Sequence, residues 1–140
     1  MTVKIVENQK ELEDAFSVRR TVFIDEQNVP AEEEIDQHEE EATHLVLYHE
    51  NRPVGAGRFR LVDGYGKVER ICVLKQARGT GAGKAIMNGI EDYARNKGIQ
   101  KLKLNSQVHA IPFYAGLGYE VVSEEFIDAG IPHKTMVKHI

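Results

Sequence analysis

The sequence predicts a mixed α/β (α+β) fold, in which a mostly antiparallel central sheet of about six or seven strands is flanked by helices. Three observations predict it: strand-like segments separated by turns come first, a unit of strand, glycine-rich loop, helix and strand follows, and short strand patterns close the chain. The chain has 140 residues, 41% hydrophobic and 29% charged. This length and composition fit one domain over residues 1–140 with one core.

The first element is predicted to be a short strand over residues 2–6, which is rich in β-branched side chains. Asn8 suits the N-cap of the helix that follows, because its side chain can accept a hydrogen bond from the first turn. Pro30 interrupts this helical pattern, and the acidic residues 31–41 are expected to hold a second, short helix. The residues at helical spacing in the first helix are Leu12, Ala15, Phe16, Arg19 and Val22.

Three strands are predicted to form an antiparallel meander in the middle of the chain. They cover residues 44–48, 54–62 and 67–74, and segments rich in turn-forming residues separate them. The second of these strands contains Gly55 and Gly57, which indicate a β-bulge or close packing against a neighbouring element.

The C-terminal half is predicted to alternate helices and strands. One helix begins at Ala82 and ends at the C-cap signal Lys97-Gly98, and its apolar side chains repeat every three or four residues. The elements expected after it are a strand over residues 99–106, a short helix over 111–117 and strands over 119–123 and 135–138.

Composition and charge exclude several classes of function. The net charge of −4 argues against general nucleic-acid binding, because phosphate backbones require a basic face. No segment reaches the roughly 18 apolar residues of a membrane span, and the first residues lack the apolar run of a signal peptide, so a cytoplasmic location is expected. Cys72 is the only cysteine and the histidines show no metal-ligand spacing, so neither a disulfide nor a metal site is predicted.

A glycine-rich loop lies between a predicted strand and a predicted helix, over Arg78-Gly79-Thr80-Gly81-Ala82-Gly83-Lys84. Such a loop presents successive backbone N–H groups and the positive end of the helix dipole, which together bind a phosphate. A Walker A loop would need glycine in place of Arg78 and Ser or Thr in place of Ala85. A dinucleotide-binding fingerprint would need glycine in place of Lys84.

The loop resembles the pyrophosphate-binding Gln/Arg-x-x-Gly-x-Gly/Ala signature of the GNAT superfamily of N-acetyltransferases. The segment Ala110-Ile111-Pro112-Phe113-Tyr114-Ala115-Gly116-Leu117-Gly118-Tyr119 resembles the later helix of that family, with its Phe-Tyr pair and closing Gly-aromatic step. The N-terminal half is similar to the narrower ElaA-like branch through Arg19, Val22-Phe23, Glu26-Gln27 and Val29-Pro30, as is Gly130-Ile131-Pro132-His133 near the end. Lys75 and Ala77 depart from the usual proline and aromatic residue before the loop.

The resemblance implies that the protein binds acetyl-CoA as co-substrate and transfers its acetyl group to a primary amine. It implies central strands that splay apart, so that pantetheine adds to the exposed edge at Val73 as an extra strand and a backbone N–H polarises the acetyl carbonyl. The cofactor-binding residues that the resemblance implies are Ile71, Cys72, Val73, Arg78, Gly79, Thr80, Gly81, Ala82, Gly83, Lys84, Asn105 and Phe113.

Tyr114 is the candidate general acid for the departing thiolate, and the alternative is an aromatic residue of the core. Glu69 is the candidate general base, acting through a water, and the alternative is a surface carboxylate paired with Arg70. His44 and His109 are weaker candidates for the base. Cys72 has no neighbour that would activate it, so direct attack in a ternary complex is favoured over an acetyl-enzyme.

The acceptor is expected to be a small amine. An acidic segment with no Lys or Arg would attract a cationic amine, and the alternative is a solvated helical face. Two other classes remain open, a coenzyme A-binding or sensing module without turnover and a nucleotide-binding protein. Members of the family often dimerise, so a homodimer is also compatible with the sequence. The carboxylates of the acidic segment are Asp25, Glu26, Glu32, Glu33, Glu34, Asp36, Glu39, Glu40 and Glu41.

Overall fold

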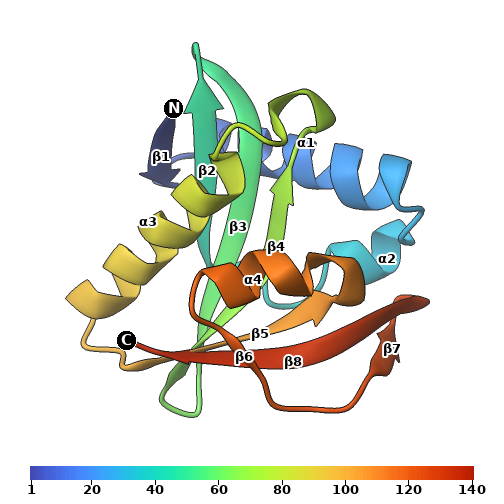
Figure 1. Ribbon diagram of the computed structural model, residues 1–140. Helices are drawn as coiled ribbons and strands as arrows, with labels where there is room; N and C mark the ends of the chain where they lie inside the picture. The colour runs from blue at the N-terminus through green and yellow to red at the C-terminus, as the bar shows by residue number, and fades with distance from the viewer.

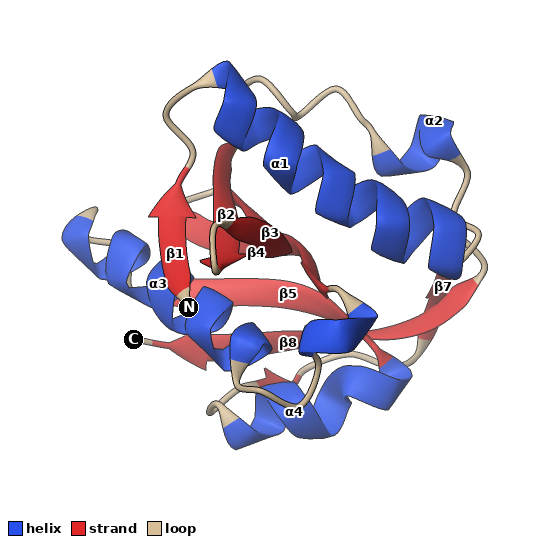
Figure 2. Ribbon diagram, turned by 90° about the horizontal axis from the view of Figure 1, so that it is seen from above, coloured by secondary structure: helices blue, strands red, loops and turns tan.

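The computed structural model describes residues 1–140 and contains one eight-stranded sheet with helices on both faces (Figures 1 and 2). The strands are β1 (Thr2–Ile5), β2 (Thr43–His49), β3 (Arg52–Val62), β4 (Tyr65–Val73), β5 (Lys101–Gln107), β6 (Glu120–Val121), β7 (Phe126–Asp128) and β8 (Ile131–His139). The α-helices are α1 (Gln9–Arg19), α2 (Ala31–Glu34), α3 (Ala82–Asn96) and α4 (Ile111–Gly116). A π-helical segment (Arg20–Glu26) continues α1, and 3-10 turns cover Lys75–Ala77 and Val108–Ala110.

The sheet is mixed and mostly antiparallel, as predicted. Its strand order is β1-β2-β3-β4-β5-β8-β6, β7 pairs with β8, and β4 with β5 is the one parallel pair. The expected count of six or seven strands was too low, because β7 has three residues and is too short to show an alternating pattern. The last strand also begins at Ile131, four residues earlier than predicted.

Local signals explain where the helices begin and end. The Asn8 side chain accepts a hydrogen bond from the Glu11 N–H at 2.9 Å, which caps α1 as expected. Gly98 follows α3 with φ of 74°, and the Ile99 N–H bonds back to the Ala94 carbonyl, which closes that helix. The acidic segment is helical only over Ala31–Glu34. None of the helices combines the length and apolar composition needed to cross a bilayer.

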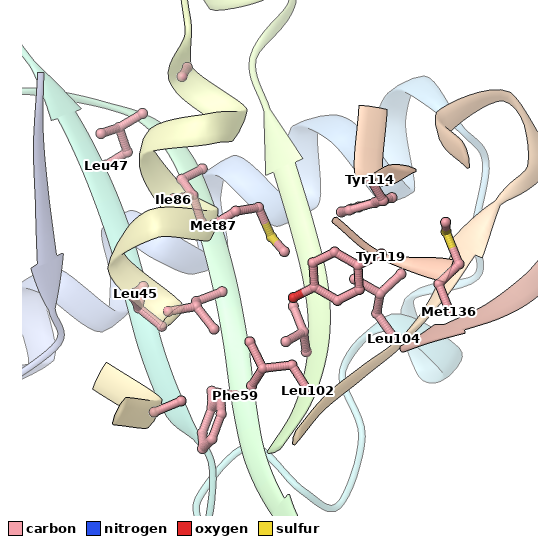
Figure 3. Packing of buried hydrophobic residues seen from close by; sticks show 14 of the residues in the cluster. Leu45, Leu47, Phe59, Ile86, Met87, Leu102, Leu104, Tyr114, Tyr119 and Met136 are labelled. Carbon is pink, nitrogen blue, oxygen red and sulfur yellow. The ribbon is translucent and has the colours of Figure 1, made fainter. Parts of the chain in front are cut away.

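Two hydrophobic cores lie on opposite faces of the sheet. Figure 2 shows α1 and α2 on one face and α3 and α4 on the other. The larger core, under α3 and α4, includes Leu45, Ile86, Leu102 and Met136, all fully buried (Figure 3). The smaller core forms where α1 packs on the side chains that β2, β3 and β4 direct to that face.

Gly55 and Gly57 let α3 approach the sheet closely, as the sequence indicated. A Cβ atom on Gly55 would lie 2.7 Å from Ile86 Cδ1 of α3, and one on Gly57 would lie 3.1 Å from Ile86 Cγ2. The predicted bulge is also present between β3 and β4, where the single residue Gly57 lies opposite two residues, Arg70 and Ile71. Arg70 adopts φ of 57°, and such a bulge re-aims the side chains around it.

The central strands splay apart. β4 and β5 pair only where Gly66–Val68 lie beside Leu102–Leu104, and beyond these residues the two strands diverge (Figure 1). The rest of β4, to Val73, and the rest of β5, to Gln107, therefore have no ladder between them. The split confirms the predicted feature and leaves a strand edge open in the middle of the sheet.

Candidate active site

A cleft of about 630 Å³ occupies the gap between β4 and β5. One wall is the end of β4 and the other is the end of β5 with Tyr114 of α4. The segment that follows α1 covers the cleft, through Val22, Phe23, Glu26, Gln27 and Val29, and the β7–β8 hairpin borders it. Both polar and apolar side chains line the cleft, as is usual for a small-molecule site.

The structure brings seven of the predicted site residues together around this cleft: Glu69, Ile71, Cys72, Val73, Arg78, Asn105 and Tyr114. The loop from Gly79 to Lys84 follows Arg78 directly but does not line the cleft, and Phe113 packs beside Gly83. Sequence reasoning missed several polar residues that line it, among them Gln27, Gln107, Asp128 and His133. Of these residues, Gln27 and His133 lie in segments that resemble the ElaA-like branch, but sequence reasoning assigned no site role to either.

The glycine-rich loop presents unpaired backbone donors at the start of α3. The N–H groups of Arg78 and Ala85 bond to backbone carbonyls, but none of the N–H groups from Gly79 to Lys84 does. These amides are therefore free. Gly79 and Gly81 have φ of 77° and 87°, and a Cβ atom on either would meet nothing within 4 Å. These amides lie at the first turn of α3, where the positive end of the helix dipole also favours an anion. The residues present therefore fit a pyrophosphate.

Gly83 has a different role from the other loop glycines. A Cβ atom there would lie 3.1 Å from Phe113 Cζ, so the glycine allows α4 to approach the start of α3. This contact explains why a residue of the Phe-Tyr pair lies beside the loop although 30 positions separate them in the sequence.

The end of β4 offers an open edge beside the loop. The Leu74 N–H bonds to the Val54 carbonyl of β3 at 2.8 Å. Because successive peptide groups of a strand point to opposite sides, the N–H and C=O of Val73 face the gap. An extended ligand can add to this edge by main-chain hydrogen bonds.

Cys72, on the same strand, is an inert thiol. Its side chain is buried in the smaller core, with Sγ 3.9 Å from the Ala56 carbonyl oxygen. Burial raises the pKa of Cys72 to about 12, so the thiolate is absent at neutral pH. This environment agrees with the expectation that Cys72 does not act as a nucleophile.

Tyr114 reaches the cleft from α4 and is 8% exposed. Its ring makes edge-to-face contacts with Phe113 and Tyr119, at centroid distances of 5.0 and 6.0 Å, and Figure 3 shows Tyr114 and Tyr119 near Met136. Burial raises the pKa of Tyr114, so the phenol stays protonated throughout the neutral range. The residue is thus a core aromatic whose protonated phenol also lines the cleft.

Glu69 lies in the cleft wall and is held by basic side chains. Its Oε1 accepts hydrogen bonds from Arg60 Nε at 2.6 Å and Arg58 Nε at 3.3 Å, and Lys67 Nζ lies 3.6 Å from its Oε2. Burial raises the pKa of Glu69, but the Arg60 hydrogen bond and the nearby positive charges outweigh it, so the net pKa is below its usual value. The predicted alternative partner was wrong, because Arg70 turns at the bulge toward Glu34 Oε2, 2.8 Å away.

The acidic segment is not a free acidic surface. Glu34, Asp36 and Glu39 bind the fully buried guanidinium groups of Arg19 and Arg58, at distances from 2.7 to 3.1 Å. Burial raises the pKa of Glu39, yet the hydrogen bonds and charge of Arg19 lower it overall to about 2. These ion pairs explain why the helix ends at Glu34, since the following carboxylates turn inward to the sheet.

The two histidine candidates separate. His44 lies outside the cleft, buried under α1, where its Nε2 donates to the Glu39 carbonyl oxygen at 2.8 Å. His109 lines the cleft, with Nε2 2.7 Å from Gln107 Oε1. His44 is therefore excluded as a base, whereas the position of His109 keeps it as a candidate. No group of three or more His, Cys, Asp and Glu side chains is arranged to hold a metal ion.

The fold and the site together define an acyltransferase of the GNAT class. The sequence model described as "Acetyltransferase (GNAT) domain" matches residues 6–140, so the chain belongs to the GNAT acetyltransferase family. Among curated relatives, the uncharacterized N-acetyltransferase YjcF of Bacillus subtilis is 55% identical over 139 residues, which cover 99% of both chains.

Solved structures share the fold over nearly the whole chain. A putative N-acetyltransferase from Lactobacillus plantarum superposes with a TM-score of 0.91 at 24% identity, covering 99% of this chain and 97% of the other. Escherichia coli ElaA has a TM-score of 0.85 at 22% identity, with 98% of each chain covered. An aminoglycoside 6'-N-acetyltransferase complexed with coenzyme A has a TM-score of 0.79 at 15% identity, covering 99% and 97%.

Proposed function

We propose that the protein is an N-acetyltransferase that moves the acetyl group of acetyl-CoA directly to a primary amine in a ternary complex. One observation carries the proposal: the free amides of Gly79 to Lys84 lie next to the open edge at Val73, which leads into the cleft. A pyrophosphate on those amides places the pantetheine arm along that edge. The coenzyme A complex of the aminoglycoside acetyltransferase with the same fold supports this choice of cosubstrate.

The reaction forms one bond and breaks one bond between heavy atoms, and it moves one proton off the nitrogen and one onto the sulfur. The neutral amine nitrogen attacks the thioester carbonyl carbon, the C–N bond forms, and the C–S bond breaks. The sulfur takes a proton from the Tyr114 hydroxyl, which solvent reprotonates, while the nitrogen gives up one proton to water. A backbone N–H of the β4 edge polarises the carbonyl, which is an effect typically worth about 3 kcal/mol.

Glu69 is the carboxylate that we propose to receive the amine proton through a water. It lines the cleft on β4, two residues before Ile71. Because its pKa is below the usual value, it is ionised whenever the amine is neutral. The low pKa also makes Glu69 a weak base, so much of its contribution comes from orienting the water and stabilising the positive nitrogen.

We propose a small amine as acceptor, with a preference for a cationic one. Five of the nine carboxylates of the acidic segment pair with arginines, so the electrostatic support rests on fewer groups than the sequence implied. Glu33 of α2 and Asp128 of β7 line the cleft and have no ion pair. If neutral amines are acetylated as fast as cationic ones at low salt, this preference is refuted.

Ligand-dependent stabilisation and turnover test the proposal in sequence. Acetyl-CoA at 100 times its dissociation constant stabilises the protein by about 2.7 kcal/mol, and ATP or NAD should not. An amine panel assayed for free thiol release then separates an enzyme from the alternative, a coenzyme A-binding module without turnover. Stabilisation by acetyl-CoA with no thiol release for any amine would favour that alternative.

A further inference from the structure

Arg78, the first residue of the glycine-rich signature, is held on two sides. Its Nη1 and Nη2 donate to the Glu26 carboxylate at 2.6 and 2.7 Å, a bidentate ion pair. Its Nε donates to the Val73 carbonyl oxygen at 3.0 Å. Glu26, Val73 and Arg78 all line the cleft. The Arg78 side chain therefore connects the segment that covers the cleft with the β4 wall of the cleft.

The bond to Val73 uses the edge that the cofactor needs. The Val73 carbonyl faces the gap, and it is the acceptor that an added pantetheine strand would take. Arg78 Nε already occupies that acceptor. A carbonyl oxygen can accept two hydrogen bonds, so the competition arises because the Arg78 guanidinium lies on the gap side of Val73, where the pantetheine strand would add.

The position of Glu26 is fixed by its neighbour. Gln27 exchanges hydrogen bonds with Gln107 at the end of β5, at 2.8 and 3.5 Å. Consecutive residues thus connect the covering segment to both walls of the cleft, Glu26 through Arg78 to β4 and Gln27 directly to β5. Glu26 is held where it can keep Arg78 on Val73, and 52 residues separate the two partners in the sequence.

We propose that Glu26 is a positioning residue that keeps Arg78 across the cofactor path, and that acetyl-CoA binds by displacing the Arg78 side chain from Val73. The proposal rests on the proposed function, because it takes acetyl-CoA as the ligand of the Val73 edge. Glu26 is then a determinant of cofactor affinity that makes no contact with the reacting atoms. In the bound state Arg78 is released to the pyrophosphate beside the loop.

The test compares acetyl-CoA binding to the full-length protein and to its Glu26→Gln variant by isothermal titration calorimetry. Glutamine keeps the shape of the side chain but loses the ion pair, so Arg78 leaves Val73 more easily. We expect roughly twofold to fivefold tighter binding, the size typical of losing one exposed ion pair. In the thiol-release assay the KM for acetyl-CoA should fall more than kcat changes.

Two controls separate displacement of Arg78 from a general charge effect. Asp25→Asn removes the neighbouring exposed carboxylate, which has no ion pair, and should leave the affinity unchanged. In an Arg78→Ala background the Glu26→Gln change should have no effect, since a double-mutant cycle isolates the pair. If the wild type binds acetyl-CoA but Glu26→Gln binds it equally or more weakly, the proposal is overturned. If the wild type does not bind acetyl-CoA at all, the proposed function itself fails.

Discussion

Replacing Tyr114 with Phe removes one oxygen atom from the wall of the cleft and leaves the packing of α4 in place. The Tyr114 ring contacts Phe113 and Tyr119 edge to face, and the variant ring keeps both contacts. The hydroxyl makes no hydrogen bond with another residue of the chain, and burial is the main cause of its raised pKa. The unfolding free energy should therefore change by less than about 1 kcal/mol.

The expected loss of turnover follows from the role of the hydroxyl. General acid catalysis typically contributes about 10²- to 10⁴-fold. Because burial raises the pKa of Tyr114, proton donation is less favourable than from an ordinary phenol, and the effect should fall in the lower part of that range. We expect kcat to drop about 100- to 1000-fold, which corresponds to about 2.7 to 4 kcal/mol.

The assay combines thiol release with acetyl-CoA binding by calorimetry. Tyr119→Phe is the matched control, because Tyr119 is also buried and in contact with Tyr114 but does not line the cleft. That variant should keep kcat within a factor of two or so of the wild type. A Tyr114→Phe variant with unchanged kcat, or with affinity lost as strongly as kcat, would refute the assignment.

Three further predictions concern the loop, the base and the buried ion pairs. Gly81→Val places a β-branched residue at φ of 87°, so acetyl-CoA binding should weaken at least about tenfold, whereas Gly64→Val, at φ of 82° in a remote turn, should not affect it; equal affinities would contradict the loop assignment. Glu69→Gln should lower kcat about 10-fold or more without moving any limb of the pH–rate profile between pH 6 and 9, because the Glu69 pKa lies below its usual value; a limb that disappears in the variant would show that Glu69 titrates there. The pKa of Glu39 is lowered from its ordinary 4.5 to about 2, so its ion pair stabilises the fold fully above pH 4.5 and this stability is lost as the pH falls to about 2. Urea unfolding should show the unfolding free energy falling over this pH range in the wild type, and an equal fall in Glu39→Gln would contradict the assignment.

Most of the fold could be predicted because the signals were local. Asn8, Gly98 and the spacing of apolar residues determine α1 and α3 within a few neighbouring positions. The meander followed from turn residues in the same way. The end of α2 could not be predicted, since it depends on carboxylates that bind Arg19 and Arg58 from other elements. The π-helical segment after α1 likewise left no periodic signal of its own.

The candidate site shows the same difference between local signals and contacts made by residues far apart in the chain. The glycine-rich loop is one continuous segment, so the sequence could place it before α3, and its binding of a phosphate stays a prediction. The partners of Glu69, Arg78 and Gln27 are set by contacts between residues far apart in the chain, up to 80 positions for Gln27 and Gln107. No spacing in the sequence encodes such contacts, and for this reason the sequence assigned Glu69 a wrong alternative partner and treated the acidic segment as a free surface.

A structure of the protein bound to acetyl-CoA shows whether the glycine-rich loop and the β4 edge hold the cofactor. We predict a pyrophosphate on the amides of Gly79 to Lys84, main-chain hydrogen bonds from pantetheine to Val73, and the thioester sulfur within hydrogen-bond distance of the Tyr114 hydroxyl. A complex in which acetyl-CoA binds elsewhere and those amides contact only solvent would contradict this prediction.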